Sequence, residues 1–183
     1  MIVGFAGKKG AGKDFAGNYL IEKYGFKKYA FADNLKRGIQ EIFFLEDDQL
    51  WGESKEIDDE FWGVSPRKLM QTIGTEIFRD SLHKYFKCNW EKGNFWVKCF
   101  EKWYEKNGGN VVITDVRFYE EADIIKKMGG IIIFIDRQGL LYDNHSSENY
   151  YINYDYIVKN IERGQLFNDI DKCLIKGVNE IIC

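Results

Sequence analysis

With 183 residues, the chain has the length of about one domain and can bury a core without disulfides or metal ions. Hydrophobic residues make up 45% and charged residues 30%, a globular rather than a disordered composition. The net charge of −3 disfavours nucleic-acid binding, because neutralising phosphates needs a basic surplus. No apolar run reaches the roughly 20 residues that cross a bilayer, and no basic leader precedes the first apolar segment. We therefore expect a cytoplasmic protein that binds neither a nucleic acid nor a membrane.

The cysteines indicate reduced thiols rather than a metal centre. They are Cys88, Cys99, Cys173 and Cys183. No two of them form a C-x-x-C pair, and the chain has only two histidines. Zinc sites need closely spaced cysteine and histidine ligands, so we expect no zinc and thiols that stay reduced, as in the cytosol.

Short apolar runs alternate with amphipathic segments along the chain. We predict strands over 2–6, 26–31, 111–114, 131–135 and 156–158. We predict helices over 13–24, 33–44, 65–82, 95–107, 119–128 and 164–182. Continuous apolar strands separated by helices are typical of an α/β fold with a mostly parallel sheet covered on both faces.

Two predicted helices begin with a capping residue, and one segment has no periodic pattern of hydrophobic residues. Asp33 is a predicted cap, and Ser65 followed by Pro66 is a capping serine with proline in the first turn. Residues 45–64 are acidic and aromatic without clear periodicity, so we expect a loop and a short helix there. We predict one domain over 1–183 with a helical insertion near 45–105, and a flexible segment follows near 137–150.

The turn after the first predicted strand has the chemistry of a phosphate-binding loop. It reads GKKGAGKD and matches the spacing G-x-x-x-x-G-K between a strand and a helix. Glycines let backbone N–H groups turn onto phosphate oxygens, and the helix N-terminus and Lys13 add positive charge. The predicted phosphate-binding residues are Gly7, Lys8, Lys9, Gly10, Ala11, Gly12, Lys13 and Asp14. The alternative is a glycine-rich turn without a ligand.

Two aspartates are candidate Mg²⁺ ligands. Asp14 stands where a serine or threonine usually binds Mg²⁺, and its carboxylate can hold the ion directly or through water, although it also repels phosphate. Asp115 ends the predicted strand 111–114, the position from which an acid organises Mg²⁺ in phosphate-loop proteins. An ordinary strand-end aspartate is the alternative for Asp115.

A polar stripe follows one side of the predicted helix over 65–82. At 100° per residue, Arg67, Gln71, Thr75 and Arg79 fall within a sector of ~120°. Gly74 lies beside them and would let a planar group approach the backbone. Such a line suits recognition of a phosphate and a base edge, but periodicity does not separate it from a solvated helix face.

Charged residues also follow the strand over 111–114, at the edge where open α/β sheets bind ligands. Arg117 can pair with a phosphate, and Glu121 can fix that arginine or a sugar hydroxyl. The alternative is an acid-rich helix N-terminus, which the helix dipole favours.

Six segments, in the same order along the chain, resemble the deoxynucleoside monophosphate kinases of tailed bacteriophages and large DNA viruses. They are GKKGAGKD (7–14), FADNLK (31–36), SPRKLMQTIGTEIFRD (65–80), FWVKCF (95–100), ITDVRFYEEAD (113–123) and HSSE (145–148). The block over 65–80 and the DVRF block are the specific ones. The resemblance implies the three-layer P-loop NTPase fold of nucleoside monophosphate kinases.

What the resemblance implies for function is ATP- and Mg²⁺-dependent phosphorylation of a deoxynucleoside 5′-monophosphate, in the host cytoplasm if the protein is viral. The implied acceptor-site residues are Lys36, Arg67, Lys68, Gln71, Gly74, Thr75, Trp96 (on the base), Asp115, Arg117 and Glu121. The implied catalytic residues are Lys13, Arg79, Arg117 and Arg137, the last at the start of a lid. The aromatic residues of 43–62 either form a homodimer face or cover the acceptor pocket.

Three departures from the family pattern bear on these expectations. Phe15 replaces a threonine, Tyr119 replaces a proline, and the connection over 81–94 is longer than usual, which bears on Trp96. Animal phosphomevalonate kinases share a similar loop and are the closest rival. Transfer to another small phosphorylated molecule and a non-catalytic nucleotide-binding module are therefore the alternative functions.

Overall fold

The computed structural model describes residues 1–87, 90–140 and 152–181, and the chain divides into two compact units. The sheet unit comprises residues 1–30 and 104–183, and the helical unit comprises residues 31–103. The helical unit overlaps the predicted insertion over 45–105 and begins earlier in the chain. Each unit is described by itself below.

The sheet unit contains five parallel strands in the order β2-β3-β1-β4-β5. Their bounds are β1 (Ile2–Ala6), β2 (Lys27–Tyr29), β3 (Val111–Ile113), β4 (Ile131–Asp136) and β5 (Tyr156–Lys159). β1 lies between β3 and β4, with Gly4 opposite Ile113 on one side and Ile132 on the other. The chain thus leaves β1 at the centre of the sheet, where open parallel sheets bind their ligands.

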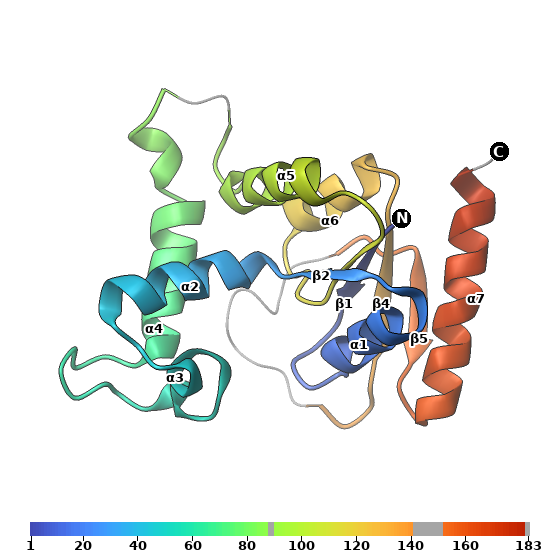
Figure 1. Ribbon diagram of the computed structural model, residues 1–183, viewed down its shortest axis with the longest axis horizontal. Coiled ribbons are helices and arrows are strands. Elements are labelled where there is room, and N and C mark those ends of the chain that lie inside the picture. The colour runs from blue at the N-terminus through green and yellow to red at the C-terminus, as the bar shows by residue number, and fades with distance from the viewer. Residues whose placement is uncertain (88–89, 141–151, 182–183) are drawn as a thin grey trace. The chain divides into compact units, whose positions relative to one another are not determined.

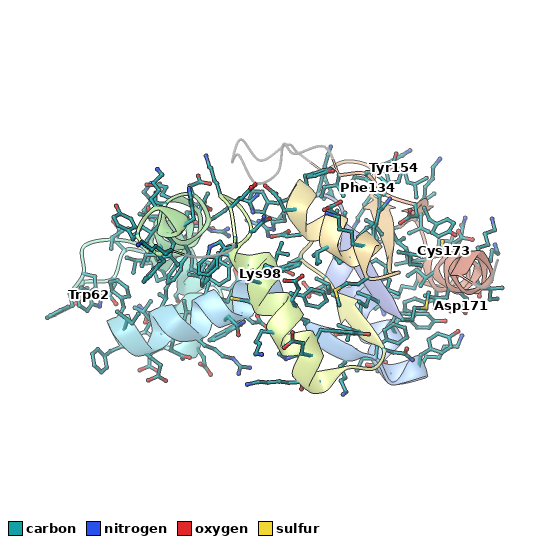
Figure 2. All side chains as sticks on the ribbon, turned by 90° about the horizontal axis from the view of Figure 1, so that it is seen from above. Trp62, Lys98, Phe134, Tyr154, Asp171 and Cys173 are labelled. Atoms are coloured by element: carbon teal, nitrogen blue, oxygen red, sulfur yellow. The ribbon has the colours of Figure 1, made fainter. Side chains whose placement is uncertain are left out.

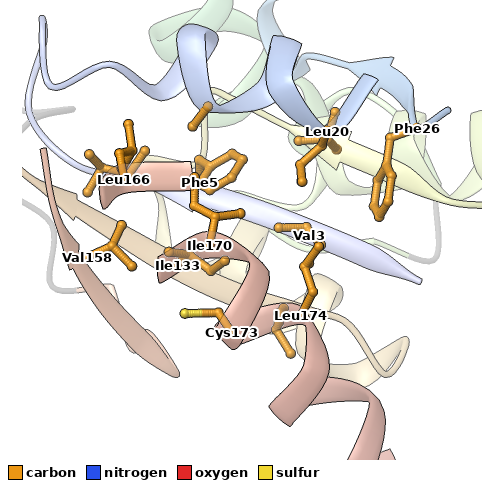
Figure 3. Close-up of a cluster of buried hydrophobic side chains, with 14 of the residues drawn as sticks. Val3, Phe5, Leu20, Phe26, Ile133, Val158, Leu166, Ile170, Cys173 and Leu174 are labelled. Carbon is orange, nitrogen blue, oxygen red and sulfur yellow. The ribbon is translucent and has the colours of Figure 1, made fainter. Parts of the chain in front are cut away.

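Helices cover both faces of this sheet because its strands are buried on both sides. Val3, Phe5 and Ile133 belong to the core cluster under α1 (Lys13–Tyr24) and α7 (Arg163–Ile181), as Figures 1 and 3 show. On the other face, Gly4 lies against Ile125 of α6 (Tyr119–Lys127). Each fully buried aliphatic or phenylalanine side chain stabilises the fold by about 1.5–3 kcal/mol. The predicted three-layer α/β architecture is confirmed.

Aromatic and charged side chains fasten α7 to α1. Asp171, labelled in Figure 2, accepts hydrogen bonds from the hydroxyls of Tyr19 and Tyr24 and from Lys23 Nζ, all at 2.8–2.9 Å. The ring of Phe167 stacks on Tyr19 at 3.9 Å between centroids. Partial burial acts to raise the pKa of Asp171, but these hydrogen bonds outweigh it and hold the pKa below its ordinary value. The C-terminal helix is therefore fixed next to the helix that begins at Lys13.

The helical unit is built from short helices around a small apolar core. Its elements are α2 (Phe31–Phe43), α3 (Asp47–Trp51), η1 (Ser54–Glu56), α4 (Pro66–Gln71), η2 (Thr72–Arg79), η3 (Leu82–Lys84) and the first part of α5 (Phe95–Asn107). Ile39, Leu45 and Leu50 form the buried centre of this core. The loop and short helix expected over 45–64 are confirmed by α3 and η1.

Two predicted helices differ from the observed ones. α2 begins at Phe31, so the predicted cap at Asp33 is wrong; Phe31 is buried and packs against Phe100 at 5.8 Å between ring centroids. The helix over 65–82 begins as predicted, with the Ser65 hydroxyl accepting from the backbone N–H of Lys68. After α4, however, the backbone continues as the π-helix η2 rather than as an α-helix.

The other predicted elements agree with the structure to within two residues at each end. Within the described part of the chain, no helix is both long enough and apolar enough to cross a membrane.

Candidate active site

The loop between β1 and α1 has the backbone geometry of a phosphate-binding turn. Gly7 adopts φ 137°, and a Cβ there would collide with the carbonyl oxygen of Ile135. Gly12 adopts φ 101° and is the N-cap of α1. Residues with side chains rarely adopt these angles, so the glycines of the motif are required by the turn itself. The N-terminus of α1 therefore opens directly onto the loop.

Two of the predicted catalytic cations, Lys13 and Arg137, bond to carbonyl groups of this loop. Lys13 reaches back from the first turn of α1, and its Nζ donates to the carbonyl oxygens of Gly7 at 2.6 Å and Lys8 at 2.9 Å. Arg137 follows β4, and its Nη1 donates to the carbonyl of Gly10 at 3.2 Å. An ammonium and a guanidinium thus gather at a helix N-terminus, an arrangement that attracts phosphate oxygens.

The structure joins Asp14 to the carboxyl end of β3. Asp14 Oδ1 accepts from Thr114 Oγ1 at 2.8 Å and from Lys28 Nζ at 3.0 Å. Partial burial acts to raise the pKa of Asp14, but these two hydrogen bonds and the charges of Lys28 and Lys13 outweigh it, so the pKa lies below its ordinary value. Asp14 is therefore ionised at neutral pH. Asp115 directly follows Thr114, so the two candidate Mg²⁺ ligands share one edge of the sheet.

The carboxylates of Asp14 and Asp115 suit Mg²⁺ better than they suit a metal ion whose ligands all come from the protein. Among the described residues, no group of three histidine, cysteine or acidic side chains is placed to hold a metal ion. Mg²⁺ usually keeps several waters and binds one or two carboxylates together with substrate phosphates. The carboxylates of Asp14 and Asp115 match that requirement.

Glu121 fixes the loop that carries Arg117. It is 3% exposed, and its Oε2 accepts from the backbone N–H groups of Arg117 at 2.8 Å and Phe118 at 3.1 Å. A carboxylate at this position also suits the N-terminus of α6. The sequence predicts that Glu121 fixes Arg117, and the structure shows that Glu121 does so through the backbone N–H of Arg117. This hydrogen bond sets the point from which the Arg117 side chain extends.

In the helical unit, two predicted acceptor-site cations have partners on neighbouring elements. Arg67 Nε bonds to Glu56 Oε1 at 2.8 Å, and Lys36 Nζ lies 5.4 Å from the centre of the Trp51 ring. Lys68 is exposed at the start of α4. Gln71 and Thr75, the other polar members of the set, are half-buried.

The π-helix changes the interpretation of the polar stripe. The backbone N–H of Asp80 donates to the carbonyl of Thr75 at 2.9 Å, five residues back, so η2 turns more widely than the α-helix on which the stripe was predicted. Arg79, at the end of η2, is only 6% exposed. A solvated helix face is therefore the wrong interpretation for Arg79. Such π-helical turns are frequent at functional sites.

Gly74 and Trp96 serve packing within the helical unit. Trp96 is 8% exposed, and its indole Nε1 donates to the carbonyl of Gly74 at 3.0 Å. The position of a Cβ on Gly74 is filled by the side chain of Leu35. The sequence predicts that Gly74 lets a planar ligand approach the backbone. That prediction is wrong for the side on which a Cβ would stand, because Leu35 occupies it. A contact of Trp96 with a nucleobase stays a prediction.

Part of the predicted site lies outside the described residues. This applies to the HSSE segment over 145–148 and to most of the lid predicted over 137–150. Conversely, sequence reasoning missed Thr114 and Lys28, which hold Asp14, and Asn160, which bonds to the phosphate loop. Lys28 and Asn160 lie in no motif, and Thr114 lies within the ITDVRFYEEAD block without a role that the block assigns; each meets its partner only through the sheet.

Comparison with known proteins identifies one family. A family model described as deoxynucleotide monophosphate kinase matches residues 48–163. A protein of Acanthamoeba polyphaga mimivirus, assigned as a deoxynucleotide monophosphate kinase, is 42% identical over 164 residues, which cover 81% of this chain and 80% of that protein. The deoxynucleoside-5′-monophosphate kinase of Escherichia phage T5 is 31% identical over 106 residues, which are 57% of this chain and 38% of the phage protein.

A solved structure supports the fold alone. The crystal structure of TT1252 from Thermus thermophilus aligns with a TM-score of 0.52 at 12% identity, and the alignment covers 96% of both chains.

Proposed function

This chain belongs to the deoxynucleotide monophosphate kinase family, its reaction is the phosphorylation of a deoxynucleoside 5′-monophosphate, and we propose that ATP bound with Mg²⁺ at residues 7–14 is the donor. The observation that carries the proposal is the loop itself. Its glycines adopt the required angles, and Lys13 already lies across it. When ATP binds, the ammonium of Lys13 would leave the carbonyl oxygens of Gly7 and Lys8 and bind the outer phosphates of ATP. The guanidinium of Arg137 would likewise leave the carbonyl oxygen of Gly10 and bind a phosphate.

Asp14 and Asp115 are the proposed Mg²⁺ ligands of this donor site. Thr114 and Lys28 hold the Asp14 carboxylate in one orientation, and its lowered pKa keeps it charged. When bound, Mg²⁺ neutralises charge that develops on the phosphate oxygens. Phe15, which replaces the threonine typical of the family, packs against Phe167 with 5.1 Å between ring centroids.

The proposed acceptor residues come mainly from the helical unit, with Asp115, Arg117 and Glu121 from the sheet unit. We propose that Arg67, Lys68 and Gln71 bind its phosphate and sugar. Glu56 bonds Arg67 through Nε and so orients the guanidinium without using its two terminal amino groups. The remaining proposed acceptor residues are Lys36, Gly74, Thr75, Trp96, Asp115, Arg117 and Glu121.

Catalysis then requires positioning and charge neutralisation rather than a general base. A monophosphate oxygen is already anionic at neutral pH, so no proton has to be removed from it. We propose that Lys13, Arg79, Arg117 and Arg137 neutralise the charge spread over the transferring group. Excluding water would prevent ATP hydrolysis, and we assign that role to the lid predicted over 137–150.

The substrates of this reaction are small nucleotides. We further propose that the protein works in the cytoplasm without a nucleic-acid partner. In the helical unit, Phe44 and Phe61 are 88% and 84% exposed, and Phe61 packs on Trp62. A homodimer face and a cover for the acceptor remain the two proposed uses of these rings, and sedimentation with and without substrate separates them.

A coupled ADP-release assay tests the reaction. ATP and Mg²⁺ are supplied with each deoxynucleoside monophosphate, with the ribonucleotides and with phosphomevalonate. We expect one or more deoxynucleotides to stimulate ADP release strongly. Stimulation by phosphomevalonate alone would favour the rival enzyme, and ATP binding without consumption would favour a non-catalytic module.

A charge-removing substitution tests the donor site in the same assay. Lys13→Ala should lower turnover about 10²- to 10³-fold, the typical effect of removing one group that stabilises transition-state charge. Lys172→Ala is the matched control, because Lys172 is an exposed lysine of α7 that pairs with Asp169. Near-normal turnover of Lys13→Ala would contradict the proposed donor site.

A further inference from the structure

A side chain from the last strand of the sheet reaches the phosphate loop. Asn160 directly follows β5, and its backbone N–H donates to the carbonyl of Asp136 at 2.8 Å, so its main chain continues the pairing of β5 with β4. Its side-chain Nδ2 donates to the carbonyl of Ala11, also at 2.8 Å. The same nitrogen lies 2.5 Å from where a Cβ on Gly12 would be, so only a glycine permits this approach.

This hydrogen bond fixes the direction of the peptide group between Ala11 and Gly12. A trans peptide is planar, and its C=O and N–H bonds point in opposite directions. Holding the Ala11 carbonyl toward Asn160 therefore aims the N–H of Gly12 away from Asn160. Gly12 is the N-cap of α1, so this N–H belongs to the group at a helix N-terminus that binds phosphates.

Asn160 differs in one respect from the other side chains that bond to carbonyl groups of the loop. Lys13 and Arg137 also hold loop carbonyls, but each carries a charge for which a phosphate competes. Asn160 is neutral, so an arriving phosphate has little attraction for its amide compared with an ammonium. Its bond to Ala11 can persist when the two cations turn to the nucleotide.

We propose that Asn160 is a positioning residue of the donor site: it holds the Ala11–Gly12 peptide in its phosphate-binding orientation before ATP arrives. A donor that is already oriented needs no reorganisation on binding, so Asn160 sets the affinity for ATP and leaves the acceptor site alone. This inference rests on the proposed function, in which residues 7–14 bind ATP.

Two substitutions with different consequences test it. Asn160→Ala removes the hydrogen bond and should raise the KM for ATP about five- to tenfold, the loss expected for one neutral hydrogen bond. Asn160→Asp keeps nearly the same shape but turns a carboxylate oxygen toward the Ala11 carbonyl, so its KM for ATP should rise further. The KM for the deoxynucleoside monophosphate should stay within twofold in both variants.

A matched control is available on the same unit. Asn168→Ala removes an exposed asparagine of α7 and should change neither KM. The thermal unfolding midpoint of each variant shows whether the fold is retained. If Asn160→Ala does not fold, Asn160→Ser replaces it in the same comparison.

Two outcomes would overturn the inference. One is a folded Asn160 variant with a KM for ATP within twofold of wild type. The other is a parallel rise of both KM values with a lower unfolding midpoint, which indicates general destabilisation. Fluorescence titration with an N-methylanthraniloyl ATP analogue separates this failure from that of the proposed function: wild-type binding by Lys13→Ala would refute the donor site itself. Weak binding by Lys13→Ala with normal binding by the Asn160 variants would refute only the role of Asn160.

Discussion

The phosphate loop and the segment η2 both carry predicted substrate-binding residues, but their geometries have different origins. The loop is shaped largely by contacts between residues that are close in sequence, such as those of Lys13 with Gly7 and Lys8. The segment η2 leaves α-helical geometry after Gln71 and ends in the buried Arg79. The turn geometry of a glycine-rich motif can therefore be predicted from sequence. The side of a helix on which residues lie can be predicted only if the helix keeps about 3.6 residues per turn, and η2 does not.

Gly12 of the loop and Gly74 of η2 show the same difference between the two regions. Gly12 is required by its positive φ and by the close approach of Asn160. Gly74 has helical geometry and gives room to Leu35 and a carbonyl to Trp96. Substituting alanine at each position should therefore affect different properties, namely donor binding in the loop and stability in the helical unit.

Among the glycine and thiol tests of this comparison, the largest effect is expected for Gly12→Ala. An alanine at φ 101° is strained by about 1–3 kcal/mol, and its Cβ would displace Asn160 from Ala11. We expect kcat/KM for ATP to fall about ten- to hundredfold, measured by the coupled assay at varied ATP. Gly25→Ala is the control, because Gly25 ends the same helix at φ 69° but has open space around it. It should lower stability without changing the KM for ATP, and an equal change in both variants would contradict the comparison.

An intermediate effect is expected in the helical unit. Gly74→Ala should lower the free energy of unfolding by about 1–3 kcal/mol, because its Cβ would overlap the end of the Leu35 side chain. Gly38→Ala, in the middle of α2 with open space around it, should instead raise stability by about 0.5–1 kcal/mol. Urea unfolding measures both. A stabilised Gly74→Ala protein would show that Leu35 adapts without cost.

The smallest effect concerns one thiol in each unit. Burial raises the pKa of Cys173 in the sheet unit to about 11, and burial raises the pKa of Cys99 in the helical unit as well. Because the thiolate is the reactive form, a raised pKa lowers reactivity at neutral pH. Cys173 is buried whereas Cys99 is half-buried, so we expect iodoacetamide at pH 8 to label Cys173 more slowly than Cys99, as followed by peptide mass spectrometry. Faster labelling of Cys173 would mean that α7 opens more readily than α5.

The family assignment came from contiguous blocks of sequence and is confirmed. The sixteen residues over 65–80 lie within the segment matched by the family model, and the mimivirus relative shares 42% identity. The loop over 7–14 lies outside that segment, and its glycine geometry agrees with the assignment. These findings favour the nucleotide enzyme over the phosphomevalonate kinase alternative. The roles of individual site residues remain predictions for the substitutions above to test.

The sequence by itself determined the strands, most helix bounds, the parallel α/β class and the glycine-rich turn between β1 and α1. Each of these follows from interactions over a few residues: apolar runs that must be buried, a serine and proline at Ser65 and Pro66, and glycines at required angles. Only the tertiary structure decided what holds Asp14, what occupies the space at Gly74 and that Asn160 bonds to Ala11. Those contacts join segments as many as 149 residues apart, and no local pattern encodes which distant side chain will arrive.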